Sequence, residues 1–171
     1  MIETHRTEQS IAAPAHAGRN GNLPAKDRSL LAAGDMIIYP FLWHWQHQSG
    51  LQRAEKMRPC VVLMRINESD PTAIILPITT KAPSLRHDRL FVPAEECAAI
   101  GMPHHLQASI GLNDFNFDTI STSTCIRKRV PMRSFSPQYM EHVMSEFRRV
   151  YDAKRAHSVT RIPDPDLEYS M

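Results

Sequence analysis

The stretch Gly34–Met64, GDMIIYPFLWHWQHQSGLQRAEKMRPCVVLM, decides the fold. Its two apolar runs, Met36–Trp43 and Cys60–Ile66, flank the polar segment 44–56. Short, nearly continuous apolar runs that are bounded by Gly, Pro, Asn or Asp are typical of buried β-strands. The sequence therefore predicts two core strands, joined by a long His-rich connection that ends at Arg58.

Further strands follow along the chain. Thr72–Thr79 is a third apolar run, and the connection 67–71 before it has the residues of a tight turn, so the second and third strands are predicted to pair antiparallel. Weaker strand patterns occur at Asp88–Val92, Gln107–Leu112 and Phe117–Ile126.

Two helices are predicted. Pro93–Gly101 has Pro at its start and Gly at its end, and 136–156 has Ser136 as N-cap, Pro137 at the first position and apolar residues at helical spacing. Short strands followed by a terminal helix, without strand–helix–strand alternation, predict a mainly β fold. We expect a small antiparallel barrel capped by the C-terminal helix.

The totals favour one domain with tails. Of the 171 residues, 1–32 and 158–171 lack periodicity and are rich in polar, Pro or small side chains, so we expect a disordered leader, a domain at 33–157 and a flexible tail. The 20 Lys and Arg residues nearly balance 18 Asp and Glu residues. A net charge of +2 gives no global field that would dictate a nucleic-acid partner.

Cysteine usage and hydropathy point to a cytoplasmic protein without membrane contact. Cys60, Cys97 and Cys125 are odd in number and have no C-x-x-C spacing, which favours reduced, mostly buried thiols over disulfides or a zinc site. No apolar run approaches the roughly 18 residues of a membrane span. No cofactor is expected.

Arg58 and Thr79 are the first candidates for chemistry. If the second and third strands pair, the start of one lies beside the end of the other, and these two side chains become neighbours. A guanidinium and a hydroxyl, with the backbone N–H groups of Thr80 and Lys81, could hold a scissile phosphate without metal. The alternative is an arginine paired with a loop carboxylate and a threonine that favours strands.

The order of these motifs resembles a known family. Gly34-Asp35 opening a strand, Arg58-Pro59 before an apolar strand and Pro77-Ile78-Thr79 ending the next are similar to the core of the PemK/MazF toxins of type II toxin–antitoxin systems. The resemblance covers 34–92, and the terminal helix agrees in position.

The resemblance implies a homodimeric SH3-like barrel that cleaves single-stranded RNA without metal and inhibits growth until a cognate antitoxin covers its groove. The ribose 2′-hydroxyl would be the nucleophile, Arg58 the acid or base and phosphate ligand, and Thr79 a support for the transition state. The family's Arg-Thr-Ile-Asp segment corresponds to part of Ala108–Ser121, which has Asp118 in the last position but Phe115 in place of the arginine.

The connection before Arg58 offers further RNA-binding candidates, namely Lys56, His44 and His47. An imidazole there could be the general base, because it titrates near working pH, or it could simply be solvated. If the first strand extends this far, Trp43 and Trp45 alternate with the histidines at its end. The tryptophans could then pack in the core or stack on bases.

Other polar segments allow two interpretations each. Arg127 and Arg129 belong to a basic cluster that could track a phosphate backbone or be a solvated loop. The polar residues of 113–118 could read base edges or form turns. His44-x-x-His47 and His104-His105 lack carboxylate or Cys companions at ligand spacing, so no metal site is predicted.

Two other functions fit the same fold. A catalytically silent barrel that binds RNA or protein is favoured by the absent arginine at Phe115. A gyrase-poisoning toxin of the related type would not need the pair formed by Arg58 and Thr79.

Overall fold

A computed structural model describes residues 31–82, 84–103, 107–126 and 133–161. The predicted leader lies almost entirely outside these residues. The chain is mainly β, with eight strands and three helices in the described parts. In chain order they are β1 (Asp35–Tyr39), α1 (His44–Gln48), β2 (Arg58–Ile66), β3 (Thr72–Thr79), β4 (Arg89–Phe91), α2 (Ala94–Ala99), β5 (Ser109–Gly111), β6 (Asp114–Thr119), β7 (Arg133–Ser134), α3 (Pro137–Asp152) and β8 (His157–Thr160).

Strand β3 is the centre of the sheet. It pairs antiparallel with β2 through the turn at 67–71, which confirms the predicted pairing. On its other edge it pairs first with β6, where Thr72 lies opposite Thr119, and then with β5, where Thr79 lies opposite Ser109. The strand order is β4-β5-β3-β2-β1-β7, with β6 and β8 on a second branch.

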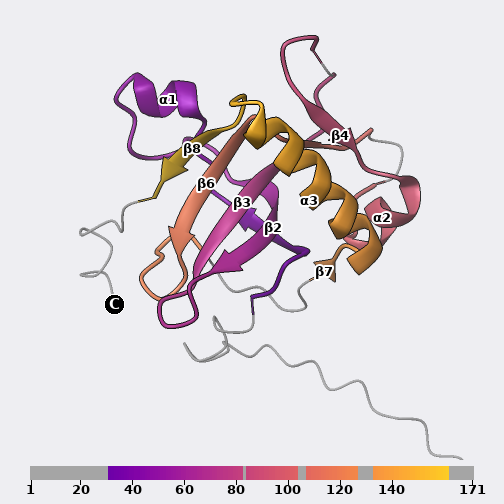
Figure 1. The fold of residues 1–171 in the computed structure, drawn as a ribbon, viewed down its shortest axis with the longest axis horizontal. Coiled ribbons are helices and arrows are strands. Elements are labelled where there is room, and N and C mark those ends of the chain that lie inside the picture. Colours follow the sequence, from indigo (N-terminus) through magenta and orange to yellow (C-terminus); the bar gives the residue numbers. More distant parts are fainter. Residues whose placement is uncertain (1–30, 83, 104–106, 127–132, 162–171) are drawn as a thin grey trace, which may run out of the picture.

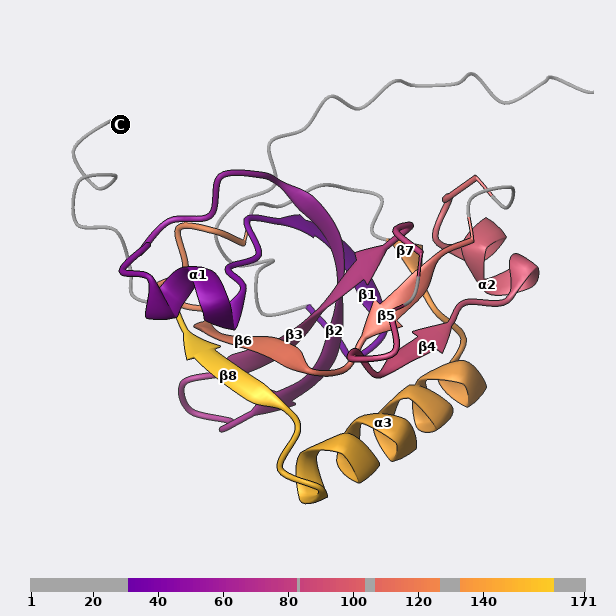
Figure 2. The same cartoon turned by 90° about the horizontal axis from the view of Figure 1, so that it is seen from above.

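The sheet is open, and the predicted closed barrel is not formed by the described residues. Because β3 changes its partner from β6 to β5, the sheet splits into two branches, and β4, β7 and β8 end as edges. All ladders are antiparallel except that between β6 and β8, which is parallel. A register shift between Val62 and Met64 marks an irregularity of β2, and this strand is visibly curved in Figure 2.

Strands β2 and β3 are buried on both faces. Val61 and Leu63 of β2 pack in a core that α3 covers, while Cys60 and Val62 belong to a second core on the opposite face. Figure 1 shows α3 lying across one face of the sheet. Successive side chains of a strand point to opposite faces, so burial of both explains why the apolar runs are nearly continuous.

Helix α3 confirms its predicted start. Ser136 Oγ accepts a hydrogen bond from the backbone N of Tyr139 at 3.2 Å, and Pro137 occupies the first helical position. Its buried face packs on the first core through Tyr139, Met140, Val143, Phe147 and Val150. Helix α2 likewise lies within the predicted segment 93–101.

The predicted extension of the first strand to Trp43 is wrong. Strand β1 ends at Tyr39, because Pro40 has no N–H with which to continue a ladder. Helix α1 then begins at His44, and Gln46 Oε1 accepts a hydrogen bond from the backbone N of Trp43 at 3.1 Å. The tryptophans and histidines therefore lie around a helical turn instead of alternating on a strand.

Two further boundaries differ from those predicted. The strand predicted at Phe117–Ile126 begins at Asp114 and ends at Thr119. Beyond it, Ile120 and Ile126 fold over the second core and are buried there. The predicted tail begins with residues that belong to β8, whose Val159 is buried against β6.

The three cysteines are free, and Cys60 and Cys97 are buried, which confirms the prediction that the thiols are mostly buried. Among the described residues, the structure contains no helix with the length and apolar character needed to cross a membrane.

Candidate functional site

Arg58 and Thr79 line one cavity of about 350 Å³, which we call the Arg58 groove. Arg58 is the first residue of β2 and Thr79 the last of β3. The antiparallel register, with Cys60 opposite Pro77, brings these two strand ends side by side. The predicted proximity of the two side chains is therefore confirmed.

The guanidinium of Arg58 lies over Trp43 and is incompletely hydrogen-bonded. Its Cζ lies 5.5 Å from the centroid of the Trp43 ring, within cation–π range. Its Nε is buried, and no described residue accepts a hydrogen bond from it. A buried donor without an acceptor is costly, and an anionic ligand beside the guanidinium would compensate its charge.

Thr79 lies in a fixed turn. Its Oγ1 accepts a hydrogen bond from the backbone N of Lys81 at 3.2 Å, and Arg89 Nη1 donates to the carbonyl oxygens of Lys81 and Ala82 at 2.7 and 3.1 Å. Because Oγ1 is the acceptor in its bond, the Thr79 hydroxyl hydrogen can point into the groove. Lys81 lines the groove, whereas Thr80 is exposed outside it.

Asp114 is the titratable carboxylate at the start of β6, and it also lines the Arg58 groove. Burial raises the pKa of its carboxyl above the ordinary value, and the nearby imidazoles of His157, His44 and His87 lower it in part. A carboxylate in this environment can accept and release a proton closer to neutral pH than an exposed one.

The three imidazoles come from distant segments. His157 opens β8 directly opposite Asp114 in the parallel register, and its backbone N donates to the carbonyl oxygen of Asn113 at 2.7 Å. The rings of His44 and His157 stack, with centroids 4.7 Å apart and planes 14° from parallel. Helix α1 lies beside β8 in both ribbon views (Figures 1 and 2).

The neighbouring carboxylate, Asp88, is committed to structural contacts. Asp88 N and Asn113 Oδ1 are 2.6 Å apart in a hydrogen bond, and Asn113 Nδ2 donates to Asp88 Oδ2 at 3.0 Å. The same carboxylate pairs with Arg155 at 3.1 Å and Arg149 at 3.6 Å. These contacts tie the connection before β4 to β6 and to the end of α3, and they fix one wall of the groove.

The two tryptophans have different roles. Trp43 is half-buried and packs edge-on against Phe41, with ring centroids 5.0 Å apart. Trp45 lines the groove and is 63% exposed. Of the two interpretations for these side chains, core packing holds for Trp43, while Trp45 presents an indole to solvent beside Arg58.

The other predicted RNA-binding residues divide between the groove and its surroundings. Lys56 lines the Arg58 groove, and His44 lines the cavity next to it. His47 is exposed and lines neither cavity. Arg127 and Arg129 lie outside the described residues.

Asp118 is a correction to the predicted set. It is 4% exposed, and its Oδ2 accepts hydrogen bonds from the hydroxyls of Tyr39 and Ser123, both at 2.8 Å. A buried carboxylate that binds two internal hydroxyls is not presented to RNA. The alternation of β6 points Asp118 into the second core, which the sequence alone did not indicate.

The sequence offered no strong indication of Asp114, His157 or His87 as acid–base groups. Their proximity depends on the parallel pairing of β6 and β8 and on the position of α1, none of which has a local sequence signature. No group of three or more His, Cys, Asp or Glu side chains among the described residues is arranged to hold a metal ion. His104 and His105 lie outside those residues.

No family model, curated protein or solved structure matches the chain. The function of the Arg58 groove therefore rests on its geometry and chemistry.

Proposed function

We propose that the chain is a metal-independent endoribonuclease that binds and cleaves single-stranded RNA in the Arg58 groove. One observation carries the proposal: a guanidinium with a buried, unsatisfied donor lies in the same cavity as a strand-end hydroxyl and a carboxylate of raised pKa. Phosphodiester cleavage by an internal 2′-hydroxyl needs these three groups, which bind the phosphate, stabilise its growing charge and accept a proton.

Arg58 and Thr79 act on the phosphate. The guanidinium donates to non-bridging oxygens, on which negative charge increases as the 2′-oxygen attacks, and the Thr79 hydroxyl donates to the same group. The cation–π contact with Trp43 restrains the guanidinium before RNA arrives, so less conformational freedom is lost on binding.

The proton transfers involve the titratable side chains of the groove. The 2′-hydroxyl gives its proton to Asp114 while the bond from the 2′-oxygen to phosphorus forms and the bond from phosphorus to the 5′-oxygen breaks. His87, whose Nδ1 lies 2.7 Å from Ser84 Oγ, protonates the departing 5′-oxygen. The products carry a 2′,3′-cyclic phosphate and a 5′-hydroxyl, and no water or redox partner is consumed.

The surroundings of these groups suit an unpaired strand. Lys56 and Lys81 supply positive charge along the groove, and the exposed indole of Trp45 is a surface on which an unpaired base can stack. Such stacking does not need a particular base, so the cleavage preference would come from polar groups deeper in the groove.

The resemblance to PemK/MazF toxins agrees with this assignment. The antiparallel β1-β2-β3 order, with Arg58 and Thr79 at adjacent strand ends and a helix across the sheet, supports the resemblance, while the open sheet departs from the closed barrel that it implies. A homodimer, inhibition of growth and a neutralising antitoxin follow from the resemblance and belong to the same proposal.

The test is cleavage of a long single-stranded RNA with chelator present and the fragment ends mapped. We expect metal-independent cuts by the wild type and a loss of about 100-fold or more in rate for Arg58→Ala, because an electrostatic donor to the transition state is removed. Thr79→Ala should lose roughly tenfold, as expected for one hydrogen bond of about 1.4 kcal/mol.

Matched variants separate chemistry from folding. Arg148→Ala and Thr122→Ala remove the same side chains at exposed positions outside the groove and should cleave like the wild type. Arg58→Lys keeps the charge but loses the planar fork, and it should recover only part of the rate. A folded wild type that binds RNA and leaves it intact would contradict the enzyme assignment and favour a catalytically silent RNA-binding protein.

A further inference from the structure

A second cavity of about 460 Å³ adjoins the Arg58 groove. The two share Trp45, His87, Asp88, Asn113 and Asp114 in their walls, so they meet along one boundary. In volume the second cavity falls within the usual range for small-molecule sites and is large enough for a nucleotide unit.

Cations and imidazoles dominate the wall of the second cavity. Arg86, Lys154 and Arg155 line it, together with His44, His87 and His157. Of its two carboxylates, Asp88 is paired with Arg155 and Arg149, which leaves Asp114 at the boundary with the Arg58 groove. The side chains of Arg86 and Lys154 therefore give this cavity an excess of positive charge.

The turn that ends α3 places Lys154 at this wall. The backbone N of Arg155 donates to the carbonyl of Val150 at 3.1 Å, and that of Lys154 to the carbonyl of Tyr151 at 3.0 Å, which is a Schellman termination. Lys154 occupies the left-handed position of this turn, with φ of 58°. Glycine is favoured there, and a lysine costs about 1 kcal/mol.

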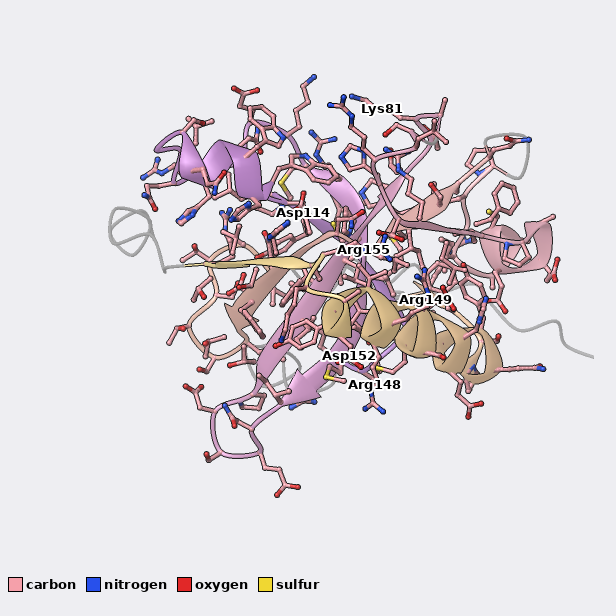
Figure 3. The ribbon with its side chains drawn as sticks, turned by 45° about the horizontal axis from the view of Figure 1, so that its top comes forward. Lys81, Asp114, Arg148, Arg149, Asp152 and Arg155 are labelled. Carbon is pink, nitrogen blue, oxygen red and sulfur yellow. The ribbon has the colours of Figure 1, made fainter. Side chains whose placement is uncertain are left out.

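The same turn directs the chain into β8, where His157 meets Asp114 of β6. Figure 3 shows Asp114 and Arg155 on the side of the molecule that carries α1 and the C-terminal end of α3. The second cavity thus joins residues from α1, the connection before β4, β6 and the segment that follows α3.

We propose that the second cavity binds the neighbouring phosphate of the same RNA strand whose scissile phosphate lies on Arg58. This inference rests on the proposed function. The strand would pass from the Arg58 groove across the exposed indole of Trp45, which lines both cavities, and its next phosphate would contact Arg86 and Lys154. The enzyme would therefore need a substrate longer than the cleaved dinucleotide.

The experiment measures binding of non-cleavable 2′-O-methyl RNA by fluorescence anisotropy over a range of salt. Two probes are used, a dinucleotide with a single phosphate and an RNA of about eight nucleotides, so that only the longer RNA carries a neighbouring phosphate for the second cavity. The variants are Arg86→Ala and Lys154→Gly, each with one cation fewer. Glycine is chosen at 154 because it suits the left-handed backbone there. Arg148→Ala is the control that loses one cation elsewhere.

We expect Arg86→Ala and Lys154→Gly each to weaken binding of the longer RNA several-fold and to lower its salt slope by about 0.7, the value for one phosphate contact on a single strand. The shorter RNA and Arg148→Ala should show wild-type values. If both variants bound the longer RNA with wild-type affinity and a wild-type salt slope, the second site would be overturned. The proposed function would still stand in that case if Arg58→Ala lost RNA binding. Failure of the folded wild type to bind either RNA would overturn both.

Discussion

The two ends of strand β6 carry the same residue type in opposite situations. Asp114, Asn116 and Asp118 lie on one face of the strand, because every second side chain of a strand points the same way, while Phe115 and Phe117 pack against the core under α3. One polar row therefore runs from the Arg58 groove into the second core.

The two buried side chains of this row, Asn116 and Asp118, are hydrogen-bonded to other parts of the chain. Asp118 accepts from Tyr39 and Ser123, and Asn116 bonds both backbone groups of Leu42, at 3.0 and 2.8 Å. Asp114 is half-buried, and its pKa is raised chiefly by burial. The difference teaches that burial with matched partners holds a fold together, whereas burial with incomplete pairing keeps a carboxylate ready to exchange a proton.

The largest expected effect is on catalysis at the groove end. Asp114→Asn keeps the shape of the side chain but cannot accept the 2′-hydroxyl proton, so we expect the cleavage rate to fall by about 10²–10⁴-fold with folding retained. The measurement is single-turnover cleavage of single-stranded RNA beside a thermal melt. Asp152→Asn, on the exposed surface of α3, is the control (Figure 3). An unchanged rate would remove Asp114 from the proposed mechanism.

The next effect is on stability at the interior end. Asp118→Ala leaves two buried hydroxyls without their acceptor and should lower the free energy of unfolding by about 3 kcal/mol. Ser123 Oγ also accepts from the backbone N of Cys125 and Ile126, at 3.1 and 2.9 Å, so the loop after β6 should loosen as well. Urea unfolding measures the loss.

A double-mutant cycle with Tyr39→Phe sharpens this prediction. The single variant Tyr39→Phe should cost about 1 kcal/mol, and its effect should be smaller in the Asp118→Ala background, because the shared hydrogen bond is already absent. Full additivity would show that the two side chains are not coupled. If Asp118→Ala were as stable as the wild type, the interior end of β6 would not have the stabilising role that distinguishes it from the groove end.

The middle of the row should show both effects at a smaller size. Asn116→Ala removes both hydrogen bonds to the Leu42 backbone and should lower stability by about 2 kcal/mol. Leu42 immediately precedes Trp43, so RNA binding should weaken too, because the indole under Arg58 loses its support. The checks are urea unfolding and anisotropy with 2′-O-methyl RNA. Lost stability with wild-type affinity would show that this peptide does not position Trp43.

The pairing of β2 with β3 could be predicted from sequence because its causes are local. A polar turn between two β-branched runs fixes the antiparallel register, and with it the proximity of Arg58 and Thr79. Helix α3 was equally predictable, since Ser136, Pro137 and the apolar spacing each act within the helix itself.

The acid–base part of the site could not be predicted in the same way. His157 reaches Asp114 through a parallel pairing of β6 with β8, and its stacking with His44 depends on the helical turn after Pro40. Both depend on tertiary packing. The alternating polar residues of β6 also gave no indication that Asp118 points into a core and Asp114 into a groove, because that depends on what covers each end.

The smallest predicted effect is the pH dependence of stability that Asp114 adds. Its pKa is raised in the folded state, so the folded chain binds the proton more tightly than the unfolded chain does. The Asp114 contribution to stability therefore declines as pH rises above the ordinary value of 3.8, until the carboxyl is ionised in the folded state too. Imidazolium groups at His157, His44 and His87 act in the opposite direction, but burial is the larger cause.

Asp114→Asn removes this contribution. The stability of the variant relative to the wild type should therefore be higher at about pH 7 than at about pH 3. Urea unfolding of both proteins at the two pH values measures the difference. The contributions of groups that the substitution does not affect cancel when the two proteins are compared. A relative stability that falls with pH would mean that the imidazoles outweigh burial. Asp114 would then be an ion-paired carboxylate. It would differ from Asp118 in the kind of partner, imidazolium instead of hydroxyl, and not in how completely the carboxylate is paired.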